Sequence, residues 1–265
     1  MIGYDIKQLD IRKIADSGQT FRMEDISDAS GDAYRCIATD KVCTAGKGII
    51  ECPPEDEKFW KDYFDLDTDY EKMSDSIDQD DAYLCCCAEY GRGIRILRQD
   101  PWEMLITFII SQRRSIPSIK TCVERLCGRY GRMLGCGLHA FPTPEELSAA
   151  GLDDLADCGL GYRSEYVYLA CRDVCSGELD LDHMKLLSDD ALFETLVKLR
   201  GVGPKVANCV CLFGFHRIGA FPVDVWIDRV LKEHYPCGFP MDRYEGYAGV
   251  MQQYMFYAAR SRQGR

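Results

Sequence analysis

The stretch LVKLRGVGPKVANCVCLFGF at 196–215 contains two apolar helical segments that meet at the glycine-rich sequence LRGVG, residues 199–203. Glycine relieves the steric limits on the backbone and allows the chain to reverse direction. The amides at the start of the second helix have no acceptor within that helix, so they can bind an anionic oxygen. The stretch predicts a helix-hairpin-helix, in which Gly201, Val202 and Gly203 hold a DNA phosphate without reading base sequence. The alternative is an ordinary tight turn between two helices.

Lys205 lies in the first turn of the second helix, because Pro204 is expected to be its first residue. A cation at that end opposes the helix dipole, whereas a neutral amine does not, and the neutral amine is the nucleophilic form. This position leaves two hypotheses for Lys205, a nucleophile and a contact to phosphate. Cys209 follows one helical turn later on the same face.

Asp224 stands before another predicted helix, within FPVDVWIDRV at 221–230. The helix that carries Lys205 travels roughly 16 Å, and the loop after it is long enough to return over that distance. The Asp224 carboxylate can therefore reach the Lys205 amine. An N-cap for its own helix is the commonest role of an Asp at this position, and the two roles are compatible.

The rest of the chain predicts an α+β protein. The short runs at 33–40 and 46–52 are typical of strands in an antiparallel sheet with hairpin connections. Asp100-Pro101 and Thr143-Pro144 are strong helix-start signals. We expect an N-terminal α+β domain at 1–90 and a mainly helical region at 91–265, with further helices near 164–175, 188–200, 204–214, 225–234 and 243–260.

Composition allows a large core, since 46% of the 265 residues are hydrophobic. The net charge of −11 argues against a chain coated in basic residues. That charge is unevenly placed, because residues 51–81 carry thirteen acids and three bases, whereas residues 92–132 carry nine bases and three acids. The sequence therefore predicts one acidic segment and one basic segment.

Several features predict a soluble, cytoplasmic protein. No apolar run approaches the roughly 20 residues of a membrane span, and the N-terminal residues lack the apolar stretch of a signal peptide. The fifteen cysteines are odd in number and include three in succession, which favours reduced thiols. No pair has the spacing of zinc ligands, so we expect no metal.

Seven segments in order resemble the helix-hairpin-helix DNA glycosylases with a Gly/Pro-Asp signature (HhH-GPD), and among them the 8-oxoguanine DNA glycosylases. The resemblance covers nearly the whole chain, with Lys205 and Asp224 at the family spacing. The segments are SGQTFRM at 17–23, YFDLDTDY at 63–70, ILRQDPWEMLITFIISQ at 96–112, LGYRSEYV at 160–167, LRGVGPKVANCVCLF at 199–213, FPVDVWIDRV at 221–230 and YAGVMQQYMF at 247–256.

The resemblance implies a bifunctional enzyme that flips 8-oxoguanine out of duplex DNA and excises it. Lys205 would attack the sugar C1′ and leave a Schiff base that permits strand cleavage, while Asp224 would stabilise the developing positive charge. Two other functions remain open on the sequence. A monofunctional glycosylase for alkylated purines would usually lack the lysine, and a silent DNA-binding module would use only the hairpin and the basic segment.

Base recognition follows from the resemblance alone. Gly18 resembles the glycine whose carbonyl accepts from N7–H of 8-oxoguanine, a proton that guanine lacks. Gln252 resembles the glutamine that reads the Watson–Crick edge of the flipped base. Phe256 resembles the aromatic residue that stacks on this base opposite Cys209. Without the resemblance, Phe256 would be interpreted as core and Gln252 as surface.

The resemblance also implies contacts to DNA. Tyr162 would act as a wedge at the vacated stack, and Arg163 would read the orphaned partner base. Arg113, followed by Arg114, stands where the family commonly has asparagines, so it could fill the gap, donate to a base or bind phosphate. Ser118 replaces an arginine that recognises the opposite cytosine in better-studied members, which predicts weaker discrimination among opposite bases.

Trp226 replaces a histidine that is common after the aspartate, and we assign it packing only. No four-cysteine cluster follows the hairpin, so an iron–sulfur cluster is not expected and the reaction should need no cofactor. The hairpin carbonyls could hold a monovalent cation when DNA is bound, as the resemblance implies. The expected partner is damaged double-stranded DNA, bound by a monomer in a prokaryotic cytoplasm, with no membrane association.

Overall fold

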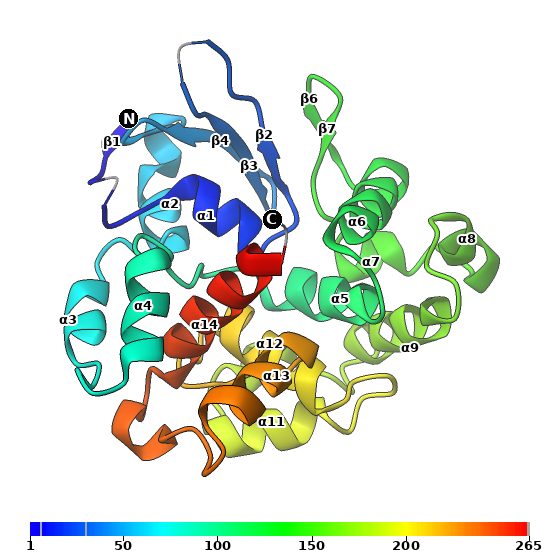
Figure 1. The fold of residues 1–265 in the computed structure, drawn as a ribbon. Coiled ribbons are helices and arrows are strands. Elements are labelled where there is room, and N and C mark those ends of the chain that lie inside the picture. Colours follow the sequence, from blue (N-terminus) through cyan, green and yellow to red (C-terminus); the bar gives the residue numbers. More distant parts are fainter. Residues whose placement is uncertain (6, 30, 264–265) are drawn as a thin grey trace. The chain divides into compact units, whose positions relative to one another are not determined.

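The computed structural model describes residues 1–5, 7–29 and 31–263, and Figure 1 draws its helices and strands. The contacts within the chain divide it into two compact units. Unit 1 comprises residues 1–36, 43–98 and 216–265, and unit 2 comprises residues 37–42 and 99–215. Both units are discontinuous, unlike the continuous ranges 1–90 and 91–265 expected from the sequence. The difference arises because the C-terminal helix packs against a helix of the N-terminal region.

The sheet belongs to the N-terminal part of the chain, and its antiparallel character is confirmed. Its five strands are β1 (Ile2–Gly3), β2 (Met23–Asp25), β3 (Tyr34–Ala38), β4 (Lys41–Gly46) and β5 (Ile49–Glu51), in the order β1-β5-β4-β3-β2. Met23 pairs with Cys36, and Ile2 pairs with Ile50. The strand expected at 33–40 ends at Ala38, because Thr39 has a φ of 52° and turns the chain into β4, which the sequence did not predict as a strand.

Helices α4 (Ala82–Tyr90), α13 (Val225–His234) and α14 (Ala248–Gln263) pack together in unit 1. The core of this unit includes the fully buried Trp60 and Phe64. The single helix expected at 243–260 is wrong in one respect, because Gly246 has a φ of 82° and separates a short 3-10 turn from α14. The remaining helical elements of unit 1 are α1 (Ile11–Asp16), η1 (Pro54–Asp56), α2 (Glu57–Tyr63), α3 (Tyr70–Asp75) and η2 (Met241–Tyr244).

Unit 2 is organised around α5 (Pro101–Ser111), which contacts α6 (Ile116–Tyr130), α9 (Arg163–Cys175) and α12 (Pro204–Phe213). The Asp100 carboxylate caps α5 by accepting from the Glu103 amide, and residues 101–110 are all buried. A helix that is buried on every side belongs at the centre of a domain. The other elements of unit 2 are β6 (Met133–Gly135), β7 (Leu138–His139), α7 (Pro144–Leu147), α8 (Leu152–Asp157), α10 (Leu181–Met184) and α11 (Asp189–Leu196).

The boundaries expected for three of the helices agree with the structure to within one residue. Helix α13 covers the expected residues 225–234, and α9 and α12 each differ from the expected range by one residue. Helix α11 is shorter than the expected 188–200, because residues 197–199 form turns that lead into the hairpin. Among the described helices, none combines the length and apolar character needed to cross a bilayer.

Candidate functional site

The hairpin predicted at 199–203 lies between α11 and α12 in unit 2. Gly201 has a φ of 82°, and a Cβ there would come within 2.3 Å of the Tyr166 ring, so the turn requires glycine. Gly203 is the N-cap of α12, with Pro204 as its first residue, and no side chain caps the helix. The amides of Gly203, Lys205 and Val206 therefore have no acceptor within the helix, which gives the turn the geometry of an anion site.

Lys205 occupies the second position of α12, as the sequence predicts. Its Nζ lies 5.3 Å from the centroid of the Phe108 ring on α5, and that ring stacks on Phe213 at 5.5 Å. No carboxylate in the described part of the chain forms an ion pair with Lys205. Cys209 is 3% exposed and lies one turn further along α12. Because the Lys205 amine lies over an aromatic ring and forms no ion pair with a described carboxylate, no such pair has to break before it can attack an electrophile.

The turn between α5 and α6 presents Arg113. This residue is exposed and has a φ of 53°, a left-handed conformation that is uncommon for a residue with a side chain. Gln112, just before it, donates from Nε2 to the carbonyl oxygens of Ile109 at 3.1 Å and Gly201 at 2.9 Å. Arg114, just after it, donates to Ser118 Oγ at 2.9 Å and to the Gly159 carbonyl.

Tyr162 and Arg163 begin α9 but have different surroundings. Tyr162 is 53% exposed, which suits the wedge implied by the resemblance, whereas Arg163 is only 5% exposed. The Arg163 guanidinium lies 4.3 Å from the Tyr162 ring centroid and donates to the carbonyl oxygens of Gln112 and Leu160. In this structure Arg163 thus binds the protein's own backbone.

Gly18 lies in a turn after α1 in unit 1, with a φ of 74°. The turn is anchored by Gln253 of α14, whose Nε2 donates to the Ser17 carbonyl at 2.7 Å. Gln19, on the other side of Gly18, is fully buried and donates to Ser17 Oγ and to the Arg95 carbonyl. No described residue donates to the carbonyl of Gly18, so this acceptor remains available to a ligand.

Asp224 caps α13, so the N-cap role expected from the sequence is confirmed. Its Oδ1 accepts from the amides of Trp226 at 3.0 Å and Ile227 at 2.9 Å. Its Oδ2 accepts no hydrogen bond from the residues that the structure describes. The Arg229 guanidinium lies over the Trp226 ring, with its Cζ 5.5 Å from the ring centroid. Oδ1 of Asp224 thus caps the N-terminus of α13, and Oδ2 can accept a hydrogen bond from a ligand.

Gln252 and Phe256 lie one turn apart on α14. Gln252 is 4% exposed, so the surface position that its residue type alone indicated is wrong. Its Nε2 donates to the Pro222 carbonyl at 3.0 Å, but its Oε1 is buried with no partner in the described protein. Phe256 is half-buried, and its ring stacks on no other described ring. A buried acceptor without a donor is costly, which is typical of a site that awaits a ligand.

Comparison with known proteins identifies the family. Residues 1–105 match the 8-oxoguanine DNA glycosylase N-terminal domain, and residues 106–242 match the HhH-GPD superfamily of base excision DNA repair proteins. The second match alone covers more than half of the chain. The chain belongs to the HhH-GPD superfamily. The family resemblance deduced from the seven sequence segments is therefore confirmed.

Individual relatives of this HhH-GPD protein agree with that assignment. The N-glycosylase/DNA lyase of Saccharomyces cerevisiae is 36% identical over 190 residues, which cover 65% of this chain and 50% of the relative. The probable N-glycosylase/DNA lyase of Methanothermobacter thermautotrophicus is 31% identical over 229 residues, 74% of this chain and 72% of the relative. This chain thus spans only half the length of the yeast relative.

A solved structure is similar over nearly the whole chain. The Clostridium acetobutylicum 8-oxoguanine glycosylase/lyase, in complex with double-stranded DNA containing cytosine opposite 8-oxoG, is 34% identical with a TM-score of 0.89. The similarity covers 97% of this chain and 93% of that one. The α+β fold class predicted from the sequence is confirmed.

The predicted site residues of this HhH-GPD protein fall into two groups. Unit 2 brings together the hairpin, Lys205, Cys209, Arg113, Arg114, Tyr162 and Arg163, whereas unit 1 holds Gly18, Asp224, Gln252 and Phe256. That Lys205 and Asp224 share a pocket stays a prediction. Gln112 and Phe108 were not predicted as site residues, because a polar residue after a helix and a phenylalanine in an apolar run carry no signal of function.

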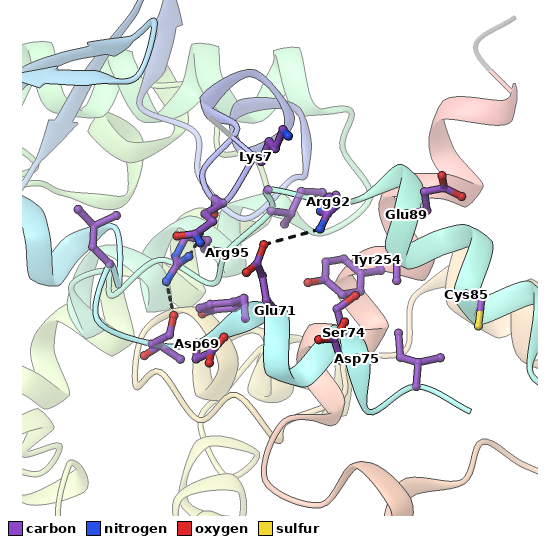
Figure 2. A pocket seen from close by; sticks show the side chains of 18 of the residues that line it. Lys7, Asp69, Glu71, Ser74, Asp75, Cys85, Glu89, Arg92, Arg95 and Tyr254 are labelled. Atoms are coloured by element: carbon purple, nitrogen blue, oxygen red, sulfur yellow. Dashed lines mark hydrogen bonds and ion pairs between the residues drawn. The ribbon is translucent and has the colours of Figure 1, made fainter. Parts of the chain in front are cut away.

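Unit 1 of the HhH-GPD protein also contains a polar cavity of about 710 Å³ (Figure 2). Arg92 pairs with Glu71 at 3.6 Å on its wall, and the Tyr254 side chain projects from α14. The Arg95 guanidinium is buried there and donates to the carbonyl oxygens of Asp65 and Thr68. None of the predicted base-binding residues lines this cavity, so it is separate from the candidate site.

Proposed function

We propose that this protein is a bifunctional 8-oxoguanine DNA glycosylase and abasic-site lyase that acts in base excision repair. The observation that carries the proposal is the position of Lys205. It follows a turn whose free amides can bind phosphate, and its amine contacts the Phe108 ring instead of a carboxylate. A lysine needed only for charge would gain more from an acidic partner.

Lys205 acts as the nucleophile. Its Nζ bonds to C1′ of the damaged nucleotide as the C1′–N9 bond breaks, and the electron pair leaves with the base, which takes up a proton. Loss of a proton from nitrogen and opening of the sugar ring give a Schiff base. The iminium makes the adjacent carbon acidic, so removal of a proton there expels the 3′ phosphate and cuts the strand.

Asp224 assists through its unbonded Oδ2. The sugar develops positive charge as the base departs, and a carboxylate held rigidly by a helix terminus stabilises that charge without reorganisation. The two amides that bind Oδ1 hold the carboxyl group in place. The geometry supports this role because capping consumes only one of the two carboxylate oxygens.

Base recognition uses acceptors that the protein leaves unsatisfied. The Gly18 carbonyl accepts from N7–H of 8-oxoguanine, and the buried Oε1 of Gln252 accepts from the Watson–Crick edge. Phe256 and Cys209 hold the two faces of the base. A site with placed acceptors rejects a base that lacks the matching donor, because the acceptor would then stay buried and unpaired.

DNA is held by the hairpin amides of unit 2 and by the exposed Arg113 of the turn between α5 and α6. The hairpin binds backbone phosphate, while Arg113 and Tyr162 enter the space vacated by the flipped nucleotide. We propose that one monomer acts on one lesion. Light scattering tests this proposal, because the mass of the protein–DNA complex should equal that of one protein chain and one duplex. A mass of two protein chains per duplex would contradict this stoichiometry.

Borohydride trapping tests the function. Wild-type protein with duplex DNA containing 8-oxoguanine should form a covalent complex, and Lys205→Gln should form none. Lys185→Gln removes an exposed lysine that follows α10 and pairs with Asp182, so this variant should trap as the wild type does. Base release without trapping would indicate a monofunctional glycosylase, and absence of both would indicate a DNA-binding module.

A further inference from the structure

The peptide bond that follows Gly18 has few restraints of its own. Gly18 has no side chain and a φ of 74°, so its backbone is compatible with more than one orientation of that peptide bond. The bond carries the Gly18 carbonyl, which the proposed function assigns to N7–H of 8-oxoguanine. A hydrogen bond needs its acceptor to point in one direction, so the neighbours of Gly18 must fix the direction of this carbonyl.

Helix α14 holds the chain before Gly18. Gln253 of α14 is 2% exposed, and its Nε2 donates to the Ser17 carbonyl at 2.7 Å. Arg260 lies seven residues further along the same face of α14, and its Nη1 donates to the Asp16 carbonyl at 2.6 Å. Asp16 and Ser17 end α1, and Figure 1 shows that end of α1 beside α14. The last carbonyl oxygens of a helix have no donor within it, so these side chains supply the donors.

Gln19 holds the chain after Gly18. Its side chain is fully buried, and its Nε2 donates to Ser17 Oγ at 3.0 Å and to the Arg95 carbonyl at 2.9 Å. Its Oε1 accepts from the Leu97 amide at 2.9 Å. The backbone is therefore anchored on both sides of Gly18, by α14 before it and by the segment 95–97 after it.

The same α14 carries the second acceptor of the proposed base site. Gln252 directly precedes Gln253, and its buried Oε1 has no partner in the described protein. N7–H and the Watson–Crick side lie on different edges of a purine, so both acceptors can bind one base only when their separation is fixed. Helix α14 places the Gln252 acceptor directly and the Gly18 acceptor through Gln253.

We propose that Gln253 is a positioning residue that determines specificity for 8-oxoguanine. It ties the Gly18 turn to α14 and thereby sets the direction of the Gly18 carbonyl relative to Gln252. It acts through the Ser17 carbonyl and not on the base itself. The inference rests on the proposed function, because it concerns the same base site. A misdirected Gly18 carbonyl would lose the hydrogen bond that distinguishes 8-oxoguanine from guanine.

Two substrates separate base recognition from the chemistry at the sugar. A duplex with 8-oxoguanine must be recognised before excision, whereas a duplex with a preformed abasic site has no base to recognise and needs only the Lys205 amine. Gln253→Met should slow single-turnover excision of 8-oxoguanine by about tenfold or more, and cleavage at the abasic site should stay within about twofold of the wild type. Equal slowing of both reactions would indicate a merely structural role, and that result or unchanged excision would overturn the proposal.

Two further variants guard this test against a folding defect. Arg260→Met removes the other bond between α14 and the same turn, and that bond is exposed, so the core is left intact. This variant should slow excision selectively, by about threefold. Gln79→Met is the matched control, because it removes a glutamine bond to the Ile77 carbonyl in the same unit and should match the wild type on both substrates. If Gln253→Met does not fold, wild-type excision by Arg260→Met would overturn the proposal.

Amide hydrogen exchange on the free protein separates failure of this inference from failure of the proposed function. Gln253→Met should quicken exchange of the amides at 17–19 by about fivefold or more, while the amides of α13 keep their rates. Unchanged exchange at 17–19 would overturn the positioning role. Absence of excision by the wild type would instead defeat the proposed function, and the exchange rates would still show whether Gln253 holds the Gly18 turn.

Discussion

Single residues in this protein are arranged against their local preference where the chemistry is expected. Lys205 stands at the positive end of a helix, Gln252 buries an acceptor with no donor, and Arg113 adopts a left-handed backbone. Each arrangement lowers stability in the free protein. Violations of this kind are expected at functional sites, where a ligand supplies the missing partner. Substitution of these residues should therefore separate stability from activity.

Lys205→Arg distinguishes a nucleophile from a phosphate contact. Arginine keeps the positive charge but stays protonated in proteins, so it cannot attack C1′. We expect the affinity for lesion-containing duplex, measured by fluorescence anisotropy, to change only a few fold. Trapping and excision should fall by about 10⁴-fold or more. Retained trapping in Lys205→Arg would show that another amine is the nucleophile.

Gln252→Met should uncouple stability from base recognition. The substitution removes one hydrogen bond to the Pro222 carbonyl but also an unsatisfied buried oxygen, so the free energy of unfolding in urea should change by less than about 1 kcal/mol. Excision should slow by about 10- to 100-fold. Gln253→Met is the comparison, because its Nε2 bond anchors the turn at Ser17, and its loss should cost about 1 kcal/mol. A Gln252→Met variant with normal excision would remove Gln252 from the site.

At the scale of elements, local signals predicted most of the helices. Asp100 with Pro101 begins α5, Thr143 forms a capping box before α7, and Asp224 caps α13, all as the sequence indicates. These features depend on a few adjacent residues. The break at Gly246 was missed, because a glycine near a helix start signals a positive φ only when the surrounding packing requires one.

The part of the candidate site that lies in one stretch of sequence was predictable, whereas the part that depends on contacts between distant segments was not. Lys205, Cys209 and the hairpin share one short stretch, so helical periodicity alone placed them together. The burial of Arg163 was not predictable, because its hydrogen bonds join α9 to a turn some fifty residues earlier in the chain. Gln112 was missed for the same reason, since its acceptor is Gly201. Contacts between distant segments depend on tertiary packing that no local pattern encodes.

Asp224→Asn separates the capping of α13 from catalysis. Asparagine is as good an N-cap as aspartate, so the thermal midpoint should stay within about 2 °C of the wild type. The negative charge is lost, and excision should slow by about 100-fold or more. Asp224→Ala should lose the same activity and also about 1 kcal/mol of stability. An Asp224→Asn variant with wild-type excision would limit Asp224 to capping.

At the scale of the whole molecule, charge follows the division into units. The acidic segment 51–81 lies entirely in unit 1, whereas six of the nine bases of 92–132 lie in unit 2 with the hairpin. The net charge of −11 therefore says little about the surface that is proposed to hold DNA. Local charge, rather than the total, sets the number of phosphates neutralised and the salt dependence of binding.

Asp65 links the acid stability of the protein to one buried network. The side chain is 2% exposed and accepts from Tyr70 at 2.8 Å, Arg98 at 2.8 Å and His216 at 3.3 Å. Burial alone would raise the pKa of Asp65, but the hydrogen bond and charge of His216, with help from Tyr70 and Thr68, lower it to about 2. His216 is also the residue at which the chain re-enters unit 1.

Asp65→Asn should therefore destabilise the protein in a pH-dependent way. A carboxylate whose pKa is depressed on folding contributes stability above its unfolded pKa, and this contribution is lost as pH falls through the folded value. Urea unfolding should show a loss of about 2 kcal/mol in Asp65→Asn at pH 7, and the gap to the wild type should close between about pH 4 and pH 2. Asp62→Asn alters an exposed carboxylate of α2 and should match the wild type throughout. A gap that stays constant down to pH 2 would show that packing, and not the charge of Asp65, stabilises this network.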